Sequence, residues 1–216
     1  MEKSQFAQKE FLILLVRLVM EELRKWERSV PIGVSNRHIH LDRADMDILF
    51  GADSEPTRIK DLVQPGQYAA AETVTLQGPK GELKRVRVLA PLRSEAQVEI
   101  SIGDSYVLGV RPPVRESGML EGTPGVRVIG PKGEVELKRG TIAALRHIHL
   151  DSATAKRMGV HDKQMVRVEI GGLRGATLNN VLLRVSDVFA PEMHIDVEEA
   201  NALGVKNGDR AYIVLD

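Results

Sequence analysis

The stretch Arg37-His-Ile-His-Leu-Asp42 occurs a second time, letter for letter, as Arg146-His-Ile-His-Leu-Asp151. A weaker third copy begins with His194-Ile-Asp196, which aligns with the His149-Leu-Asp151 part of the second copy. Identical six-residue stretches far apart in one chain are typical of an internal duplication. The sequence therefore predicts two similar lobes that face each other.

The residues around each copy indicate a short helix after it. An Asp follows the histidines and can cap the first turn of a helix, because its carboxylate accepts bonds from the free backbone N–H groups there. The glycines that would end these helices are Gly51, Gly159 and Gly204. The loops Gly78-Pro-Lys-Gly-Glu82 and Gly130-Pro-Lys-Gly-Glu134 match as well, which extends the repeat beyond the histidine motifs.

From residue 30 onward the pattern is one of short strands separated by turns. The predicted strands are β-branched-rich or alternating and span residues 73–76, 84–89, 98–102, 126–129, 165–170, 181–185 and 212–215. Turn sequences such as Gly171-Gly172 and Asn207-Gly208 separate them. The expected fold is mainly β: two similar small β-barrels with short helices, related by internal duplication.

Residues 1–28 differ from the rest because they contain no Gly or Pro. Apolar residues recur at helical spacing among charged ones, which predicts one amphipathic helix that ends before Pro31. The apolar positions are Phe6, Phe11, Leu14, Leu15, Leu18 and Leu23.

Composition excludes several classes of protein. Lys+Arg and Asp+Glu both number 30, so the net charge of zero disfavours nucleic-acid binding. The chain has no Cys, which rules out disulfides, thiolate metal sites and Cys nucleophiles. The longest apolar run, residues 11–16, is too short for a membrane span or a secretory signal. We expect a soluble intracellular protein with neither nucleic acid nor membrane as partner.

The histidines suggest metal binding. Residues i and i+2 of a strand point to the same side, so His38 and His40 can share one ion, as can His147 and His149. His194 adds a third imidazole to the second set, and zinc tolerates three protein ligands with an open fourth position. The structural alternative is that His-x-His marks a partly buried polar edge. His161 lies outside these pairs and is expected to be exposed.

The first histidine pair needs a further ligand. Glu99 lies in a strand-like run and points to the same side as Gln97. Taken alone, Glu99 and Arg93 would be solvated surface residues. Two Gly-flanked arginine loops, Arg115-Glu-Ser-Gly118 and Gly172-Leu-Arg-Gly175, could receive phosphate, although each is weak evidence.

Together these residues resemble the phosphate propanoyltransferase family, the PduL-type phosphotransacylases, from about Pro31 to the end of the chain. The resemblance rests on these motifs: Gly33-Val-Ser-Asn-Arg-His-Ile-His40, Pro91-Leu-Arg93, Gln97-Val-Glu99, Arg115-Glu-Ser-Gly118, Arg146-His-Ile-His149, and Gly172-Leu-Arg-Gly175 followed by Asn180-Val181. One small departure is Ala90, which stands where the family pattern has Gly before Pro91.

The resemblance implies reversible transfer of a short acyl group, propanoyl or acetyl, between coenzyme A and phosphate, with two zinc ions between two barrels. His38, His40 and Glu99 would hold the zinc that contacts the coenzyme A sulfur. His147, His149 and His194 would hold the other zinc, and Arg93 would bind phosphate. The chain would cross between the barrels, with residues 29–36 and 145–216 forming the first and residues 37–144 the second.

The resemblance also bears on location and partners. Family members in bacterial microcompartments often carry an N-terminal amphipathic helix as an encapsulation signal, so residues 1–28 could contact shell or cargo. Alternatively, this helix packs on its own barrel or forms a dimer interface. The expectation is a homo-oligomer, such as a dimer, in the cytoplasm and inside a microcompartment.

Two rival functions stay open at this point. The first is a dizinc hydrolase of thioesters or related acyl substrates, in which water outcompetes phosphate. The second is a metal-stabilised structural or cargo-adaptor protein whose histidines only join the lobes. Structural zinc is four-coordinate and closed, whereas catalytic zinc keeps a position for solvent or substrate.

Overall fold

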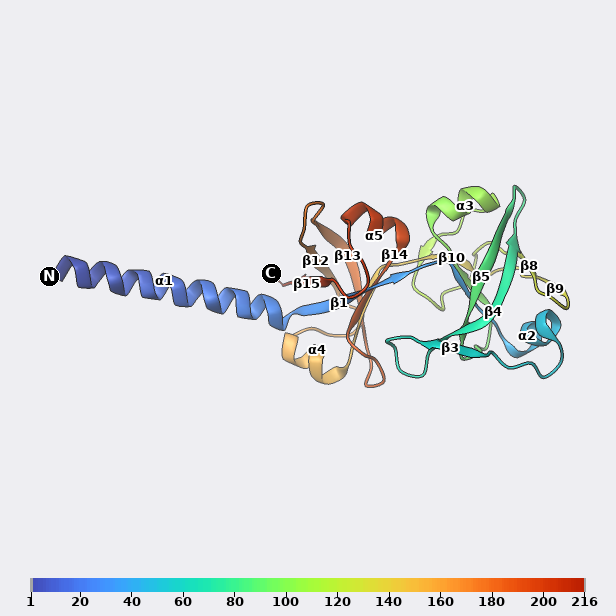
Figure 1. Ribbon diagram of the computed structural model, residues 1–216, viewed down its shortest axis with the longest axis horizontal. Helices are drawn as coiled ribbons and strands as arrows, with labels where there is room; N and C mark the ends of the chain where they lie inside the picture. The colour runs from blue at the N-terminus through green and yellow to red at the C-terminus, as the bar shows by residue number, and fades with distance from the viewer. Residues whose placement is uncertain (1, 216) are drawn as a thin grey trace.

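The computed structural model describes residues 2–215, with side chains from residue 8 onward. Within these residues the chain forms fifteen strands and five helices (Figure 1). The helices are α1 (Glu2–Glu27), α2 (Arg43–Phe50), α3 (Ile102–Leu108), α4 (Ser152–Met158) and α5 (Val197–Leu203). The strands are β1 (Ser29–Ser35), β2 (His38–His40), β3 (Arg58–Asp61), β4 (Tyr68–Gln77), β5 (Glu82–Ala90), β6 (Gln97–Glu99), β7 (Val114–Arg115), β8 (Arg127–Ile129), β9 (Glu134–Glu136), β10 (Thr141–Ala144), β11 (His147–Leu150), β12 (Met165–Ile170), β13 (Ala176–Val185), β14 (Glu192–Asp196) and β15 (Arg210–Val214). The prediction of a mainly β protein with short helices is confirmed.

Six strands close into a barrel in the order β1-β14-β11-β13-β12-β15. The alternating sequence of β12 explains how a strand contributes to it: Val166, Val168 and Ile170 are buried, and the residues between them are exposed. Buried side chains from these six strands and from α4 and α5 form one continuous hydrophobic core. The closed barrel thus holds the second histidine motif, on β11.

The second sheet has nine strands in the order β7-β10-β6-β2-β5-β4-β8-β9, with β3 paired to β4. It has its own hydrophobic core, formed largely by apolar residues of β2, β4, β5 and α2. Here the prediction of a second barrel needs correction, because this sheet curls but does not close by hydrogen bonds. Its terminal strands β7 and β9 span only two and three residues. The division into residues 29–36 with 145–216 and residues 37–144 stays a prediction.

The two histidine strands have the same neighbours in their respective sheets. β2 lies between β5, which is parallel, and β6, which is antiparallel, and β11 lies in the same way between β13 and β14. The arginine that opens each motif pairs with an acid on the helix after the antiparallel strand: Arg37 with Asp104 and Arg146 with Glu199, each at 3.0 Å. The predicted duplication accounts for this correspondence, although the duplication itself stays an inference.

Local sequence fixes the ends of the short helices as predicted. The side chains of Asp42, Asp151 and Asp196 each accept a bond from a first-turn backbone N–H. The matched loops also have a common role: the Lys80 and Lys132 N–H groups donate to the carbonyls of Leu108 and Leu49, at the ends of α3 and α2. A Cβ at Gly78 or Gly130 would lie 2.2 Å or 2.5 Å from these carbonyl oxygens, so only glycine permits the approach.

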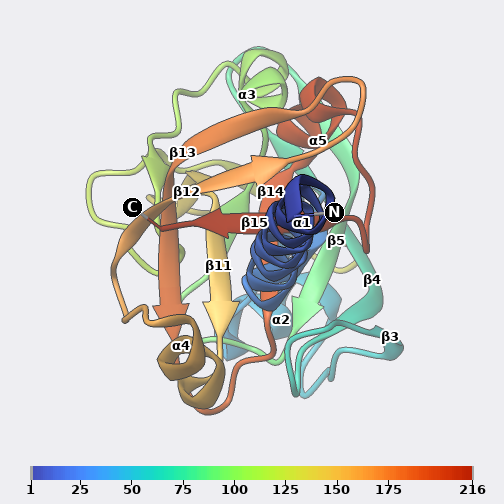
Figure 2. The ribbon, with the colours of Figure 1, turned by 90° about the vertical axis from the view of Figure 1, so that its left-hand side faces the viewer.

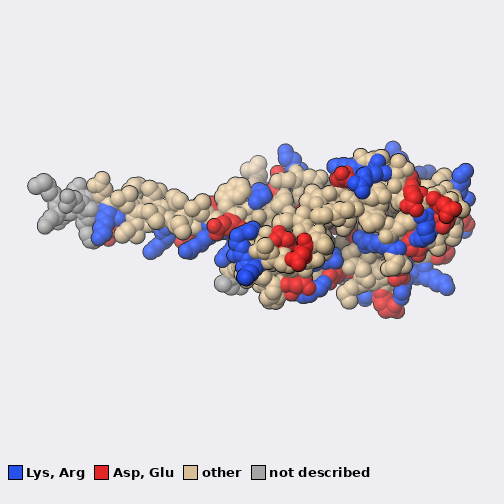
Figure 3. Space-filling model, turned by 90° about the horizontal axis from the view of Figure 1, so that it is seen from below, with Lys and Arg blue, Asp and Glu red and all other residues tan. Residues whose placement is uncertain are grey.

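Helix α1 projects from the barrel, and Figure 2 looks along it toward the barrel strands. Its apolar side chains between Phe11 and Trp26 are exposed, and Figure 3 shows mostly uncharged surface along its middle. Contacts with the barrel involve its last turn, where Lys25 pairs with Glu169 and Trp26 meets Tyr212 edge-on. The amphipathic character predicted for residues 1–28 stays a prediction, and the Phe6 side chain lies outside the described residues. Among residues 2–215, no helix has the length and hydropathy needed to cross a membrane.

Strand boundaries agree with expectation where alternation is strong and differ elsewhere. The predicted strand over residues 98–102 is too long, because β6 ends at Glu99 and α3 begins at Ile102. Pro31, which follows the end of the N-terminal helix, lies inside β1. It stands where β1 changes partner, since residues 29–31 pair with β15 and residues 32–35 with β14. A residue without an N–H is tolerated at such a change.

Candidate metal and phosphate site

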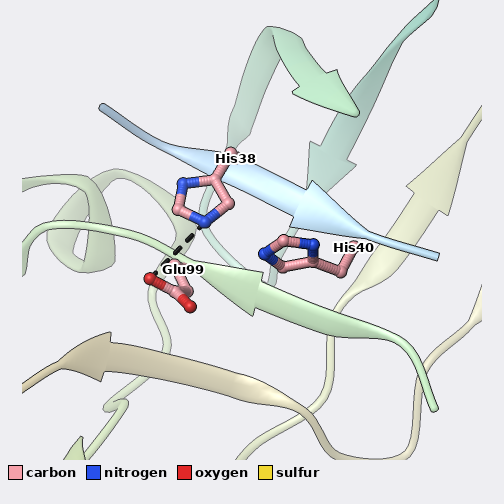
Figure 4. A group of neighbouring side chains, drawn as sticks. All are labelled: His38, His40 and Glu99. Atoms are coloured by element: carbon pink, nitrogen blue, oxygen red, sulfur yellow. Dashed lines mark ion pairs between the residues drawn. The ribbon is translucent and has the colours of Figure 1, made fainter. Parts of the chain in front are cut away.

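The first candidate cluster joins β2 to β6. His38 and Glu99 are Cα partners across this antiparallel pair, so their side chains lie on the same face as His40 (Figure 4). One ligand atom from each of these three residues lies within 4.8 Å of the others, and His38 Nε2 is 3.5 Å from Glu99 Oε2. Because His40 is only 3% exposed, the cluster is shielded from bulk water. The three residues predicted to share an ion are brought together.

Backbone carbonyls orient the first imidazole of each motif. Nδ1 of His38 lies 2.8 Å from the carbonyl oxygen of Asn36, and Nδ1 of His147 lies 2.8 Å from that of Leu145. A carbonyl can only accept, so Nδ1 carries a proton in both rings, and in the neutral form of each ring Nε2 keeps its lone pair. Histidines that bind metals in proteins are oriented in this way.

Gln97 holds the Glu99 carboxylate. Its Nε2 donates to Glu99 Oε1 at 2.6 Å and to Ser117 Oγ at 2.8 Å, while its Oε1 accepts from the Gly118 N–H at 2.8 Å. Gln97 is fully buried, so these bonds satisfy its amide where water cannot. The result is a fixed orientation for the one anionic group of the cluster.

Charge in the first cluster favours an ionised Glu99. Burial by itself would raise the pKa of Glu99, but His38, His40 and Arg93 outweigh it and hold this pKa far below its ordinary value. Burial also opposes charge on His38, yet the neighbouring Glu99 raises the pKa of His38. Burial, together with the charges of His38 and Arg93, lowers the pKa of His40 well below its usual value, so this imidazole is neutral at pH 7.

The second candidate cluster joins β11 to β14. The ring centres of His147, His149 and His194 form a nearly equilateral triangle with sides of 4.8, 4.9 and 5.0 Å. Three imidazoles bound to one tetrahedral zinc through nitrogens about 2.0–2.1 Å away have ring centres roughly 5 Å apart. His149 is 5% exposed, it stacks on Phe189, and both of its ring nitrogens lack a hydrogen-bond partner. Such orphaned nitrogens fit a metal ligand.

In the second cluster, one ring nitrogen of His194 is occupied by a carboxylate. His194 Nε2 lies 2.7 Å from Glu192 Oε2, and Gln64 Nε2 donates to the same oxygen at 3.2 Å. Within residues 8–215, only the first cluster therefore has three ligand atoms within 4.8 Å of one another. The Nδ1 of His194 is the nitrogen that this contact leaves for a metal.

Two imidazoles of the second cluster, those of His147 and His149, are neutral at pH 7. Burial and then His194 lower the pKa of His147 to about 4, although Glu99 of the first cluster acts in the opposite direction. Burial and the other two histidines lower the pKa of His149 to about 2. Neutral imidazoles are the form that binds metal.

Arg93 lies beside the first cluster, on the loop after β5. Its N–H donates to the Leu41 carbonyl at 2.8 Å, and its Nη1 donates to Ser117 Oγ at 3.2 Å. Burial first, and then the like charge of Arg184, lowers the pKa of Arg93. A partly buried guanidinium is suited to an anionic ligand.

The other arginines and the last histidine have different settings. The arginine of the Arg115-Glu-Ser-Gly118 loop donates through Nη1 to the backbone carbonyl of Glu121 at 2.6 Å. Arg174 is exposed on the β12–β13 turn, beside Gly204. His161 is exposed, as predicted, with Nδ1 2.9 Å from the Asp162 carbonyl.

Sequence reasoning missed several residues that contact the clusters. Glu192, Gln64, Phe189, Ser117 and Arg184 touch the predicted residues or their partners. Ser117 lay within the quoted Arg115-Glu-Ser-Gly118 loop but was given no role, and Glu192 carried a usable signal, because Glu192-Met-His194 repeats the spacing of Gln97-Val-Glu99. In both pairs the first residue bonds to the second across one strand residue.

Known proteins that are similar in sequence to this chain carry one family name. A family model described as phosphate propanoyltransferase matches residues 31–206. The chain belongs to this family. It is 57% identical over 181 residues to the phosphate propanoyltransferase of Rhodopseudomonas palustris, covering 84% of this chain and 80% of the relative. It is 53% identical to the enzyme of that name from Thermotoga maritima over 200 residues, 92% of this chain and 95% of the relative.

A third relative, the phosphate propanoyltransferase of Salmonella typhimurium, is 52% identical over 200 residues, 92% of this chain and 94% of the relative. Both family motifs with His-x-His, residues 37–42 and 146–151, lie inside the matched range. Family membership indicates an acyltransferase. The resemblance inferred from the motifs is thereby confirmed.

Proposed function

We propose that this chain reversibly transfers a propanoyl or acetyl group between coenzyme A and inorganic phosphate, with two zinc ions. His38, His40 and Glu99 would hold one ion, and His147, His149 and His194 the other. The carrying observation is that two largely buried histidine clusters, one of them with Glu99, lie near a partly buried arginine. This combination offers metal ligands and an anion-binding group in one place, as transfer between a thioester and phosphate requires.

Zinc, when bound, would stabilise the thiolate of coenzyme A and polarise the thioester carbonyl. The residues of the chain supply binding, orientation and charge. Arg93 would hold two phosphate oxygens at once, and Ser117 fixes its guanidinium. Gln97 keeps the Glu99 carboxylate in place, and the carbonyls of Asn36 and Leu145 keep Nε2 of His38 and His147 available.

The proposed reaction is direct attack. A phosphate oxygen forms a bond to the thioester carbonyl carbon, the carbon–sulfur bond breaks, and the products are acyl phosphate and the coenzyme A thiolate. The sequence has no Cys, and direct attack needs no nucleophilic side chain. Arg93 would offset negative charge on the approaching phosphate.

We also propose that residues 1–28 direct the enzyme into a bacterial microcompartment in the cytoplasm and that the enzyme is a homo-oligomer, such as a dimer. The exposed apolar residues of α1 support a role in contact with another protein surface. Contacts with the barrel at its last turn leave most of the helix free for such a surface.

Thiol release from acetyl-, propanoyl- and butanoyl-coenzyme A, measured with and without phosphate, tests the proposal. Phosphate-dependent release with equal formation of acyl phosphate would support it. Release independent of phosphate would indicate the hydrolase, and no release by protein with intact zinc would indicate a structural role. His161→Ala is a control for loss of an imidazole, because His161 is exposed.

A further inference from the structure

Arg184 lies on the same side of the barrel as the second histidine cluster. It is the Cα partner of His149 in the parallel pairing of β13 with β11. Partner residues of adjacent strands point to the same face of a sheet, so its side chain accompanies those of His147 and His149. The side chain is 25% exposed, which leaves part of the guanidinium accessible to a ligand.

Two contacts fix this guanidinium. Its Nε lies 3.3 Å from Glu116 Oε1, and its Cζ lies 5.7 Å from the ring centre of Phe189. The other partner of Phe189 is His149, whose ring stacks on it at 4.3 Å. Phe189 thus links the guanidinium to a candidate metal ligand.

The loop that holds Arg184 also holds Arg93. Glu116 contacts Arg184, which belongs to the closed barrel, and the next residue, Ser117, accepts a bond from Arg93, which follows a strand of the other sheet. Arg184 is also one of the charges that lower the pKa of Arg93. Adjacent residues of one loop therefore bring together two arginines from the two sheets.

The charges near this loop do not cancel. Glu116 is one carboxylate, and it pairs with both Arg184 and Lys163. With Arg93 and its neighbour Glu99 added, three cations lie near two carboxylates at this point. An excess of positive charge favours a ligand with at least one negative charge.

We propose that Arg184 is a second phosphate-binding residue, which donates to phosphate oxygens from the barrel side while Arg93 donates from the other. This inference rests on the function proposed above and adds a residue to its site. A guanidinium has five N–H donors, and the contact with Glu116 engages Nε. Two guanidiniums match a phosphate dianion, whereas water gains nothing from them, so the pair favours transfer over hydrolysis.

The test compares Arg184→Gln with Arg210→Gln, each as zinc-loaded full-length protein. Arg210 is a matched control, because it also lies on the barrel, is partly buried and stands over an aromatic ring, that of Trp26. We expect Arg184→Gln to raise KM for phosphate about 10- to 100-fold and to leave KM for propanoyl-coenzyme A within about threefold. Arg210→Gln should leave both constants at the wild-type values.

Equilibrium dialysis with inorganic phosphate supplies a readout that does not depend on turnover. Weaker phosphate binding by folded Arg184→Gln with two zinc ions supports the proposal. It would do so even if the wild-type protein released no coenzyme A, because absence of coenzyme A release would refute only the proposed function. Unchanged phosphate binding, or a rise in KM for the coenzyme A substrate alone, would overturn the proposal. If Arg184→Gln does not fold, Arg184→Met replaces it, because Met removes the charge but keeps an unbranched side chain of similar length; phosphate binding equal to wild type in that variant overturns the proposal too.

Discussion

Replacing His149 by alanine should have opposite consequences for the metal-free and the zinc-loaded protein. In the metal-free protein, an imidazole buried with both nitrogens unpartnered costs about 1–3 kcal/mol. Stacking on Phe189 and burial of the ring stabilise by a similar amount, about 1–3 kcal/mol. Because the two contributions nearly cancel, metal-free His149→Ala should have a Tm within about 4 °C of metal-free wild type.

With zinc the difference becomes large. A ligand that binds only the folded state stabilises it by about 4 kcal/mol when its free concentration is about 1,000 times Kd. In a chain of this size, 1 kcal/mol moves Tm by about 2–4 °C. Each zinc site should therefore add about 8–16 °C, and His149→Ala should lose one such increment.

The assay is thermal unfolding of both proteins at matched free zinc, together with zinc content measured on purified protein. We expect two zinc ions per chain in wild type, two in His161→Ala, and one in His149→Ala. His161→Ala is the matched control, because it removes an exposed imidazole. A folded His149→Ala protein that kept two zinc ions and the full zinc-induced rise in Tm would refute the second site.

Three further predictions concern the reaction. Arg93→Ala should weaken the use of phosphate by about 1.5–3 kcal/mol, or roughly 10- to 150-fold, and spare binding of acyl-coenzyme A; unchanged KM for phosphate and unchanged kcat would make Arg93 an ordinary surface residue. His40→Ala should weaken coenzyme A affinity, whereas His194→Ala should keep it within a few-fold and abolish turnover; equal losses of affinity in two folded variants would contradict this division of roles. Deletion of residues 1–28 should leave kcat intact and alter assembly or localisation, so a folded truncation without activity would show that the helix serves catalysis.

Much of the candidate site could be predicted because strand geometry is local. The i, i+2 spacing places His38 and His40 on one face without any knowledge of the rest of the fold. The same holds for His147 and His149. Capping by Asp42 and Asp151 is equally local, since the acceptor and the N–H it satisfies lie three residues apart.

Other members of the site could not be found in this way, because their neighbours are distant in sequence. Arg184 lies in a predicted strand like any other charged residue, and only the parallel pairing with β11 places it beside His149. Gln64 meets Glu192 across 128 residues, in a contact that no pattern in either segment indicates. Closure of the sheets also depends on contacts between distant segments. One sheet joins its ends and the other does not, and this depends on long-range pairing of strands.

The sequence by itself determined the family to which this protein belongs. The repeated motifs, their histidines and the residues Arg93 and Glu99 identified the family, because residue type and short spacing carry that information directly. The tertiary structure decided which side chains hold these residues in place and which charges face them across the two sheets. Such contacts depend on the packing of segments that are separated by tens of residues, and that packing is set by the burial of two hydrophobic cores rather than by any local pattern.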